Sequence, residues 1–455
     1  MTGTNPLTGR SQAVLPKSVF FALFFFWTAF ASAQTAKLPV FCGQEVFDYI
    51  VRRQYPDLHR AFQGAFEACA GRPSSGRSPL TIRVVVHVVW KNAEENLADS
   101  IILNQIAVLN EDYNRQNPDT AKLRPEFLPA AGNPQIRFDL AGIVRVQTNA
   151  SFKLDLAGNE LLANLKSSSQ GGSDAWNPDA YLNLWICKIQ PITIGGFTLG
   201  QILGFAFPPN NLGNWPANSG APSPAQDGVA LDYRVVGRNN PNTVDVPGGT
   251  GALVVRGRTA THEVGHYLGL RHIWGDGGIL GLPNNCDQSD GIGDTPFANA
   301  QSPFDCNKSR NTCPQTEPHY GQDMPDLVEN YMDYASEDCM NMFTRGQADL
   351  MQSVLAGPRK GLVAFSTGTS QADAEEWPFL FPNPARDGAW LQLPAAWQAA
   401  TVDLIGADGR IRNALPTAGG EQRVDLHTRA LAPGWYAVRV QTANRVWTGR
   451  LVMLP

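Results

Sequence analysis

The residues with the clearest chemical potential lie at positions 262–272, where the chain reads HEVGHYLGLRH. Residues four apart share one helix face, so His262 and His266 can present imidazole nitrogens to one metal ion. Gly269 tolerates a positive φ and lets the chain leave the helix, which brings His272 back as a third ligand. Structural zinc sites use four protein ligands, often cysteines, whereas three histidines leave one position open. The spacing therefore predicts a catalytic zinc.

Glu263, which follows the first histidine, cannot point at the metal in the same way but can reach a water bound to it. Zinc lowers the pKa of such a water toward ~7 and makes hydroxide available near neutral pH. We therefore predict peptide-bond hydrolysis by a zinc-bound water, with Glu263 as the base that later protonates the leaving amine. A helix with ordinary surface histidines is the alternative, but it leaves the Glu and Gly offsets unexplained.

The elements that must position these residues follow from hydrophobic periodicity. A β-branched run starting at Leu80 predicts a buried strand and the start of a globular domain. We expect an α/β domain over residues 78–365, with a twisted mixed sheet, two main helices and an irregular half after Gly269. Gly, Pro and Asn predict a loop from Gly195 to Ala225. The other predicted elements are helices at 101–113 and 253–274 and strands at 135–140, 181–187 and 228–233.

A second segment makes a family resemblance visible. The histidine motif resembles that of the metzincin metalloproteases, and residues 330–334, Asn-Tyr-Met-Asp-Tyr, are similar to their Met-turn. The surroundings, from about residue 80 to 360, resemble the pappalysin (cytophagalysin-like) branch. The resemblance implies that Met332 lies beneath the three imidazoles and that Tyr334 can hydrogen-bond the oxyanion of the tetrahedral intermediate. Considered without it, both residues would be assigned to the core.

The same resemblance implies further site residues. Asp338 matches an acidic residue of the primed-side specificity pocket, which implies a preference for Arg or Lys at P1′; a solvated loop carboxylate is the alternative. Four cysteines allow three pairings, and the resemblance favours two of the possible bridges. A short acidic loop could surround calcium, which similar loops in the family support. The implied bridges are Cys286 with Cys313 and Cys306 with Cys339, and the calcium candidates are Asp287, Asp290, Asp294 and Thr295.

The first 33 residues are typical of an export signal. Arg10 and Lys17 precede an apolar run at 19–30, and Ala-Ser-Ala follows at 31–33. A membrane anchor is the alternative, but the run is shorter than the ~20 residues needed to span a bilayer. We expect cleavage before Gln34, a mature protein without a transmembrane segment, and an oxidising location, either released or at the cell surface.

Residues 34–77 form a predicted propeptide. The resemblance implies that its Cys42, followed by glycine, is a latch whose thiolate ligates the zinc and displaces the water. A disulfide between Cys42 and Cys69 is the alternative. The bonds Gly71-Arg72 and Gly76-Arg77 are candidate sites of self-cleavage, because each precedes arginine.

The last unit follows a small, polar and acidic linker at residues 366–377. From 378 to 455, alternating apolar residues and Gly-containing turns predict a small all-β sandwich. Segments 381–385 and 431–436 resemble the C-terminal sorting domain of the type IX secretion system, although the final Leu454-Pro455 lacks a basic ending. A carbohydrate- or surface-binding sandwich is the alternative.

Length and charge limit the remaining possibilities. A chain of 455 residues exceeds one ordinary core, and 43 Gly with 33 Pro favour long structured loops. The formal net charge of −5 gives no basic footprint for nucleic acid. The expected partners are protein or peptide substrates and the secretion machinery. A non-enzymatic adhesin that keeps the fold is the rival function, and the intact Glu263 argues against it.

Overall fold

The computed structural model describes the chain in segments that include the histidine motif and most of the predicted elements. The predicted signal peptide, most of the predicted propeptide with Cys69, the predicted linker and Asp287 lie outside the described residues. The described residues are 40–42, 79–155, 160–194, 197–209, 220–245, 251–275, 286, 289–363, 379–381, 385–386, 388–393, 401–406, 410–416, 423–442 and 446–453.

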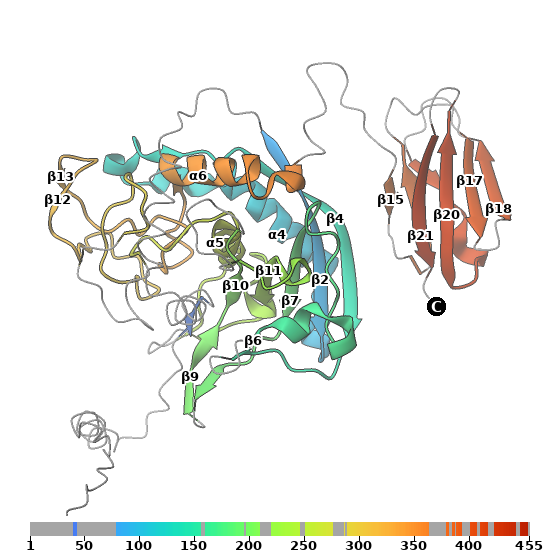
Figure 1. Ribbon diagram of the computed structural model, residues 1–455, viewed down its shortest axis with the longest axis horizontal. Helices are drawn as coiled ribbons and strands as arrows, with labels where there is room; N and C mark the ends of the chain where they lie inside the picture. The colour runs from blue at the N-terminus through green and yellow to red at the C-terminus, as the bar shows by residue number, and fades with distance from the viewer. Residues whose placement is uncertain are drawn as a thin grey trace, which may run out of the picture.

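A five-stranded sheet forms the framework of the larger unit (Figure 1). Its order is β10-β11-β7-β2-β4. Strands β11, β7, β2 and β4 run parallel to one another, and the edge strand β10 is antiparallel to β11. The strand Leu80–Trp90 is buried along most of its length, as expected for a strand covered on both faces. The predicted mixed sheet is thus confirmed. The strands are β2 (Leu80–Trp90), β4 (Ile136–Gln147), β7 (Leu182–Cys187), β11 (Val229–Asp232) and β10 (Gly204–Ala206).

Three α-helices belong to the described part of this unit, one more than the two main helices predicted. α4 (Asp99–Asp112) lies close to its expected range, and α5 (Arg258–Tyr267) is much shorter than the predicted helix at 253–274. The reason is backbone geometry, since φ is +81° at Gly257 before α5 and +94° at Gly269 after it. The prediction missed α6 (Arg345–Ala356), although a capping box between Thr344 and Gln347 marks its start.

The predicted loop from Gly195 to Ala225 is partly wrong, because it contains β9 (Phe197–Ile202) and β10. Glycines at 200 and 204 suggested loop structure, but strands pair through backbone groups, which glycine also supplies. β9 pairs antiparallel with β8 (Ile192–Ile194) and parallel with β1 (Val40–Phe41) of the predicted propeptide. A strand of the predicted propeptide therefore lies next to the segment that leads into β10.

The half after α5 is largely irregular, as predicted, and two disulfides connect its loops. Cys286 pairs with Cys313 and Cys306 with Cys339, at Cα–Cα distances of 5.6 and 5.8 Å. These are the pairings that the family resemblance implies. The remaining short strands form three pairs: β3 (Ala131–Gly132) with β14 (Phe343–Thr344), β12 (Thr316–Glu317) with β13 (Gln322–Asp323), and β5 (Leu154–Asp155) with β6 (Glu160–Leu161).

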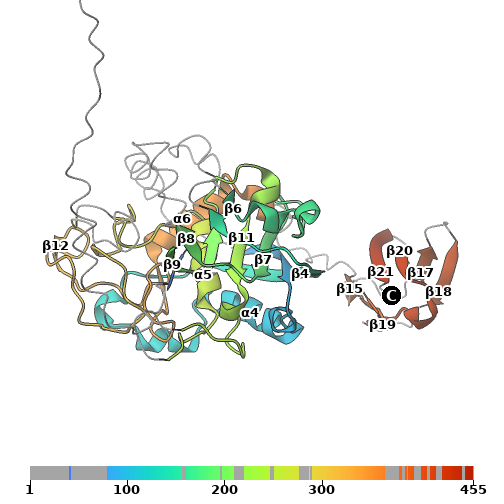
Figure 2. The ribbon, with the colours of Figure 1, turned by 90° about the horizontal axis from the view of Figure 1, so that it is seen from below.

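The C-terminal unit is all-β, as predicted. One antiparallel sheet has the order β15-β16-β19 and the other β18-β17-β20-β21, and a separate apolar core lies within this unit (Figures 1 and 2). None of the helices in the described ranges is long and apolar enough to cross a membrane. The strands are β15 (Phe379–Phe381), β16 (Trp390–Gln392), β17 (Thr401–Gly406), β18 (Ile411–Pro416), β19 (Arg423–Asp425), β20 (Gly434–Gln441) and β21 (Val446–Met453).

Candidate metal centre

Three histidine side chains converge at one point beside α5. The Nε2 atom of His266 lies 3.0 Å from that of His262 and 3.1 Å from that of His272, and the remaining Nε2–Nε2 distance is also 3.1 Å. Nitrogens about 2.05 Å from one tetrahedral ion would lie about 3.3 Å apart. All three side chains are buried. The spacing therefore fits a single zinc ion bound by three imidazoles.

The other ring nitrogens support the same assignment. Nδ1 of His262 lies 2.7 Å from the carbonyl oxygen of Tyr331, and Nδ1 of His266 lies 2.9 Å from that of Leu270. A carbonyl only accepts, so each Nδ1 carries the proton and each Nε2 keeps a lone pair. Lone pairs that face one another at 3 Å repel in the absence of a cation. The buried donor set is therefore suited to a metal.

The local sequence explains how the third histidine returns. α5 ends at Tyr267, and the positive φ at Gly269 turns the chain, as the sequence predicted. The ring of His272 then stacks on Trp274, with centroids 4.2 Å apart and planes 7° from parallel. Sequence reasoning missed Trp274, although its position two residues after the third histidine was a usable signal.

Met332 packs against α5 at Gly265, the glycine between the first two histidines. It is fully buried, and a Cβ added at Gly265 would lie 2.5 Å from its Sδ atom. The glycine between the first two histidines is therefore required by close approach of the Met332 side chain. The structure thus brings the Met-turn segment and the histidine helix into direct contact.

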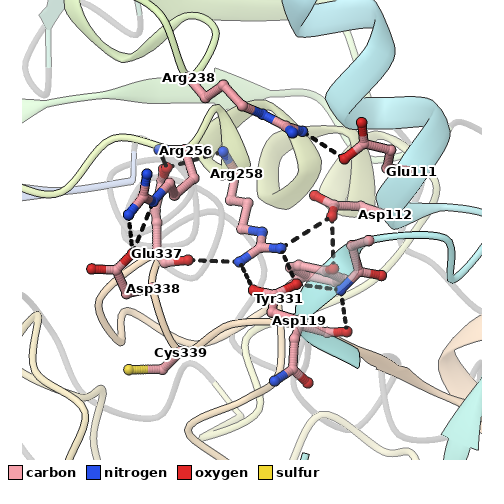
Figure 3. A network of polar contacts seen from close by, with 12 residues as sticks. Glu111, Asp112, Asp119, Arg238, Arg256, Arg258, Tyr331, Glu337, Asp338 and Cys339 are labelled. Carbon is pink, nitrogen blue, oxygen red and sulfur yellow. Dashed lines mark hydrogen bonds and ion pairs between the residues drawn. The ribbon is translucent and has the colours of Figure 1, made fainter. Parts of the chain in front are cut away.

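A buried polar network fixes the Met-turn segment to α5 and α4 (Figure 3). The Asp112 carboxylate accepts from the Tyr331 hydroxyl at 2.8 Å and from the Thr261 hydroxyl at 2.7 Å. The Arg258 guanidinium lies 3.5 Å from Asp112 and donates to Asp119 at 2.6 Å. Burial raises the pKa of Asp112 to about 6, against the lowering effect of Arg258. Through Asp112, the network thus connects Thr261, the residue before His262, with Tyr331, whose carbonyl oxygen orients the His262 ring.

Glu263 is buried next to the histidines and the edge strand. A Cβ at Gly204 of β10 would lie 2.5 Å from its Cγ and 2.6 Å from its Oε1. Its Oε2 has no hydrogen-bond partner among the described residues. Burial raises the pKa of Glu263 to about 8, and a hydrogen bond with Cys42 opposes that shift. The carboxylate is thus held in a confined position beside the histidines.

Cys42 of the predicted propeptide also enters the centre. Its Sγ and one ring nitrogen from each of the three histidines all lie within 4.8 Å of one another. Its backbone N–H donates to the Tyr334 hydroxyl at 2.8 Å. The Tyr334 ring packs against those of His262 and His272, with centroids 5.7 and 5.1 Å away. Cysteine, tyrosine and histidines therefore form one cluster.

A cleft of about 110 Å³ opens beside this cluster. Its lining includes His262, Glu263 and Tyr334, together with Ser336 and Glu337. Asp338 is not part of that lining among the described residues. Its carboxylate instead lies 2.7 Å from the Arg256 guanidinium, at the surface next to the cleft (Figure 3).

The structure brings only some of the described calcium candidates into contact with one another. The Asp290 carboxylate accepts from the Thr295 hydroxyl at 2.6 Å, while burial raises the pKa of Asp290 to about 8. One buried carboxylate oxygen of Asp290 and one of Asp294 lack a hydrogen-bond partner among the described residues. Within these residues, the group of side chains close enough to share a metal is Cys42 with the three histidines.

Comparisons with known proteins agree with this geometry. Residues 254–356 match the family described as pregnancy-associated plasma protein-A, a peptidase family, and residues 379–454 match the secretion system C-terminal sorting domain. The chain is 31% identical to extracellular metalloprotease 1 of Coccidioides posadasii over 308 residues, which cover 66% of this chain and 87% of the relative.

Two solved structures are also similar. Mature mirolysin of Tannerella forsythia in complex with a cleaved peptide is 34% identical, with a TM-score of 0.50 over 65% of this chain and 100% of its own. A promirolysin mutant from the same organism is 32% identical, with a TM-score of 0.55 over 73% of this chain and 99% of its own. The chain therefore belongs to the pappalysin family, as a metzincin-type metalloendopeptidase exported with a C-terminal sorting domain.

Proposed function

We propose that the chain hydrolyses internal peptide bonds by attack of a water molecule that Glu263 deprotonates, at a zinc ion held by His262, His266 and His272. The observation that carries this proposal is the convergence of three Nε2 atoms at 3.0 to 3.1 Å, with a buried carboxylate beside them. Zinc bound there would lower the pKa of a coordinated water toward ~7 and polarise the scissile carbonyl.

The chain's own groups supply the other steps. Glu263 takes the proton of the attacking water and returns it to the leaving amine. Its unpartnered, buried Oε2 supports this role, because the oxygen is free of competing donors among the described residues. Tyr334 donates its hydroxyl hydrogen to the developing oxyanion, a role supported by its packing against the rings of two candidate ligands. Met332 provides the apolar floor beneath the histidines.

The substrate binds as an extended strand along β10. β10 is the edge of the five-stranded sheet, contacts α5, and reaches Glu263 at Gly204. An extended peptide gains main-chain hydrogen bonds at such an edge. The sequence alone did not locate this strand, because its glycine and short length resemble a loop.

The protein is made as a zymogen in which Cys42 is the zinc latch. The position of its Sγ among the candidate ligands favours this role over a disulfide with Cys69. Two further contacts hold the propeptide segment, namely the β1–β9 pairing and the hydrogen bond from Cys42 N–H to Tyr334. Similarity to a promirolysin supports a zymogen. Release requires cleavage of the propeptide, for which Gly71-Arg72 and Gly76-Arg77 are the candidate bonds.

Asp338 selects Arg or Lys at P1′. Support comes from its position next to Ser336 and Glu337, which line the cleft. A peptide library with varied P1′ residues tests this assignment, and equal cleavage of basic and apolar P1′ residues would contradict it.

Calcium binds the loop that holds Asp287, Asp290, Asp294 and Thr295. The support is the pair of buried carboxylate oxygens without partners, since a hard cation would satisfy both. Treatment with EGTA should lower the melting temperature, and only calcium should restore it.

Residues 1–33 direct export as a cleaved signal peptide, which N-terminal sequencing of the mature protein tests.

Cleavage of an internally quenched peptide by the processed protein tests the main proposal. Glu263→Gln keeps the size and packing of the side chain but cannot accept the proton, so we expect zinc content equal to that of the parent and a loss of turnover of at least 10²-fold. Equal turnover in both proteins would refute the mechanism.

The latch has its own test in the unprocessed protein. Cys42→Ala removes the thiolate but keeps the backbone contacts of residues 40–42, so we expect measurable but incomplete activity before processing. An unprocessed variant as silent as the parent would contradict the latch.

A further inference from the structure

We propose that Arg256 is a specificity-determining residue. Its guanidinium competes with a basic P1′ side chain of the substrate for the Asp338 carboxylate. The inference rests on the proposed function, because it takes Asp338 as the carboxylate that selects basic P1′ residues. It assigns to Arg256 a role that limits this selection.

The ion pair is well defined (Figure 3). Nε of Arg256 donates to Oδ1 of Asp338 at 2.8 Å, and Nη2 lies 2.7 Å from the same oxygen. The two side chains are 52% and 44% exposed, so water and a ligand can both reach them. A substrate guanidinium would form the same kind of charge-assisted contact that Arg256 already makes.

The backbone holds Arg256 in place for this contact. The Glu337 carboxylate accepts from the backbone N–H groups of Arg256, Arg258 and Thr259, the last at 2.7 Å. Arg258 returns a hydrogen bond to the Glu337 carbonyl at 2.7 Å. Glu337 therefore fixes the segment before α5 to the loop that carries Asp338, and the ion pair joins Arg256 of that segment to the residue after Glu337.

The location of the pair connects it with substrate selection. Val255 and Arg258, which lie before and after Arg256 in sequence, line the cleft, and so do Ser336 and Glu337, which precede Asp338. Asp338 lies just beyond this lining, so a basic side chain that extends past it would meet a carboxylate already partly neutralised by Arg256. A basic P1′ residue must displace Arg256 or share Asp338 with it, whereas an apolar P1′ residue does neither.

The predicted effect is modest because exposed ion pairs are weak. Removal of Arg256 should raise the ratio of kcat/KM for an Arg substrate to that for a Leu substrate by about two- to fivefold. High salt should reduce this gain, because the Debye length falls to ~3 Å at 1 M.

The experiment compares processed enzymes on three quenched peptides that differ only at P1′, which is Arg, citrulline or Leu. Citrulline keeps the shape of arginine without its charge. Arg256→Ala and Arg256→Gln should raise the Arg-to-citrulline and Arg-to-Leu ratios, and Arg256→Lys should leave both near those of the parent. Arg238→Ala is the matched control, because Arg238 forms a similar ion pair with Glu111 at 2.7 Å, and neither residue adjoins a cleft-lining residue in sequence.

Asp338→Asn separates this inference from the proposal on which it rests. If Asp338→Asn lowers the Arg ratios while both neutral variants of Arg256 leave them unchanged, the competition is refuted and the P1′ assignment stands. If Asp338→Asn also leaves the ratios unchanged, the P1′ assignment is refuted together with the competition. An unfolding midpoint in urea equal to the parent's shows in each case that the variant is folded.

Discussion

Gly204 and Glu263 provide a sharp test of the active-site geometry, because the backbone of β10 lies directly against the proposed base. A Cβ introduced by Gly204→Ala would lie 2.5 Å from Cγ and 2.6 Å from Oε1 of Glu263. Carbon atoms in ordinary contact are about 3.5 Å apart or more, so the carboxylate must move by about 1 Å.

The size of the expected effect follows from that displacement. A misplacement of about 1 Å can reduce a rate by about 10²-fold, which corresponds to about 2.7 kcal/mol in the activation free energy. The substitution keeps the backbone N–H and C=O groups of β10, so peptide binding should change little. We therefore expect kcat to fall about 100-fold while KM and zinc content stay close to those of the parent.

Single-turnover cleavage by the processed enzyme measures the effect without interference from product release. Gly388→Ala is the control, because a Cβ at Gly388 in the C-terminal unit meets nothing within 4 Å. A Gly204→Ala enzyme that retains kcat within about threefold of the parent would refute the proposed contact between β10 and the catalytic carboxylate.

The remaining predictions concern stability. Gly265→Ala places a Cβ 2.5 Å from Met332 Sδ, so the free energy of unfolding should fall by about 1 to 3 kcal/mol in urea titrations, and an unchanged midpoint would contradict the packing. Burial lowers the pKa of His87 to about 4, below the unfolded value of 6.5, so its stabilising contribution is complete above pH 6.5 and is lost as the pH falls toward 4. His87→Gln should remove about 2 to 3 kcal/mol of that pH dependence, which unfolding at pH 7.5 and 4.5 measures against the parent. Arg124 forms a buried pair with Glu329 at 2.7 Å, so Arg124→Met should destabilise the fold by about 3 to 5 kcal/mol, and a loss below 1 kcal/mol in the same titrations would contradict it.

The convergence of the three histidines could be predicted from the sequence because the information for it is local. The offsets of His262, His266 and His272 fix their relative positions once a helix and a turn at Gly269 are assumed. The β-branched run of β2 was equally direct, since a strand buried on both faces has a continuous apolar sequence.

The parts that the sequence left open depend on contacts between distant segments. Nothing in the spacing indicates that the Tyr331 carbonyl orients His262, that Gly204 lies against Glu263, or that Arg256 pairs with Asp338. Edge strand β10 was missed because its pairing uses the backbone. α6 differs, since its capping box at Thr344 and Gln347 is a local signal that the sequence interpretation did not use.

Anomalous X-ray scattering at the zinc edge from crystals of the unprocessed protein tests the central claim most directly. We predict one strong peak within bonding distance of the Nε2 atoms of His262, His266 and His272, with the Cys42 sulfur as the fourth ligand. A zinc bound by other residues, or no zinc at the three imidazoles in protein purified without chelators, would contradict the account.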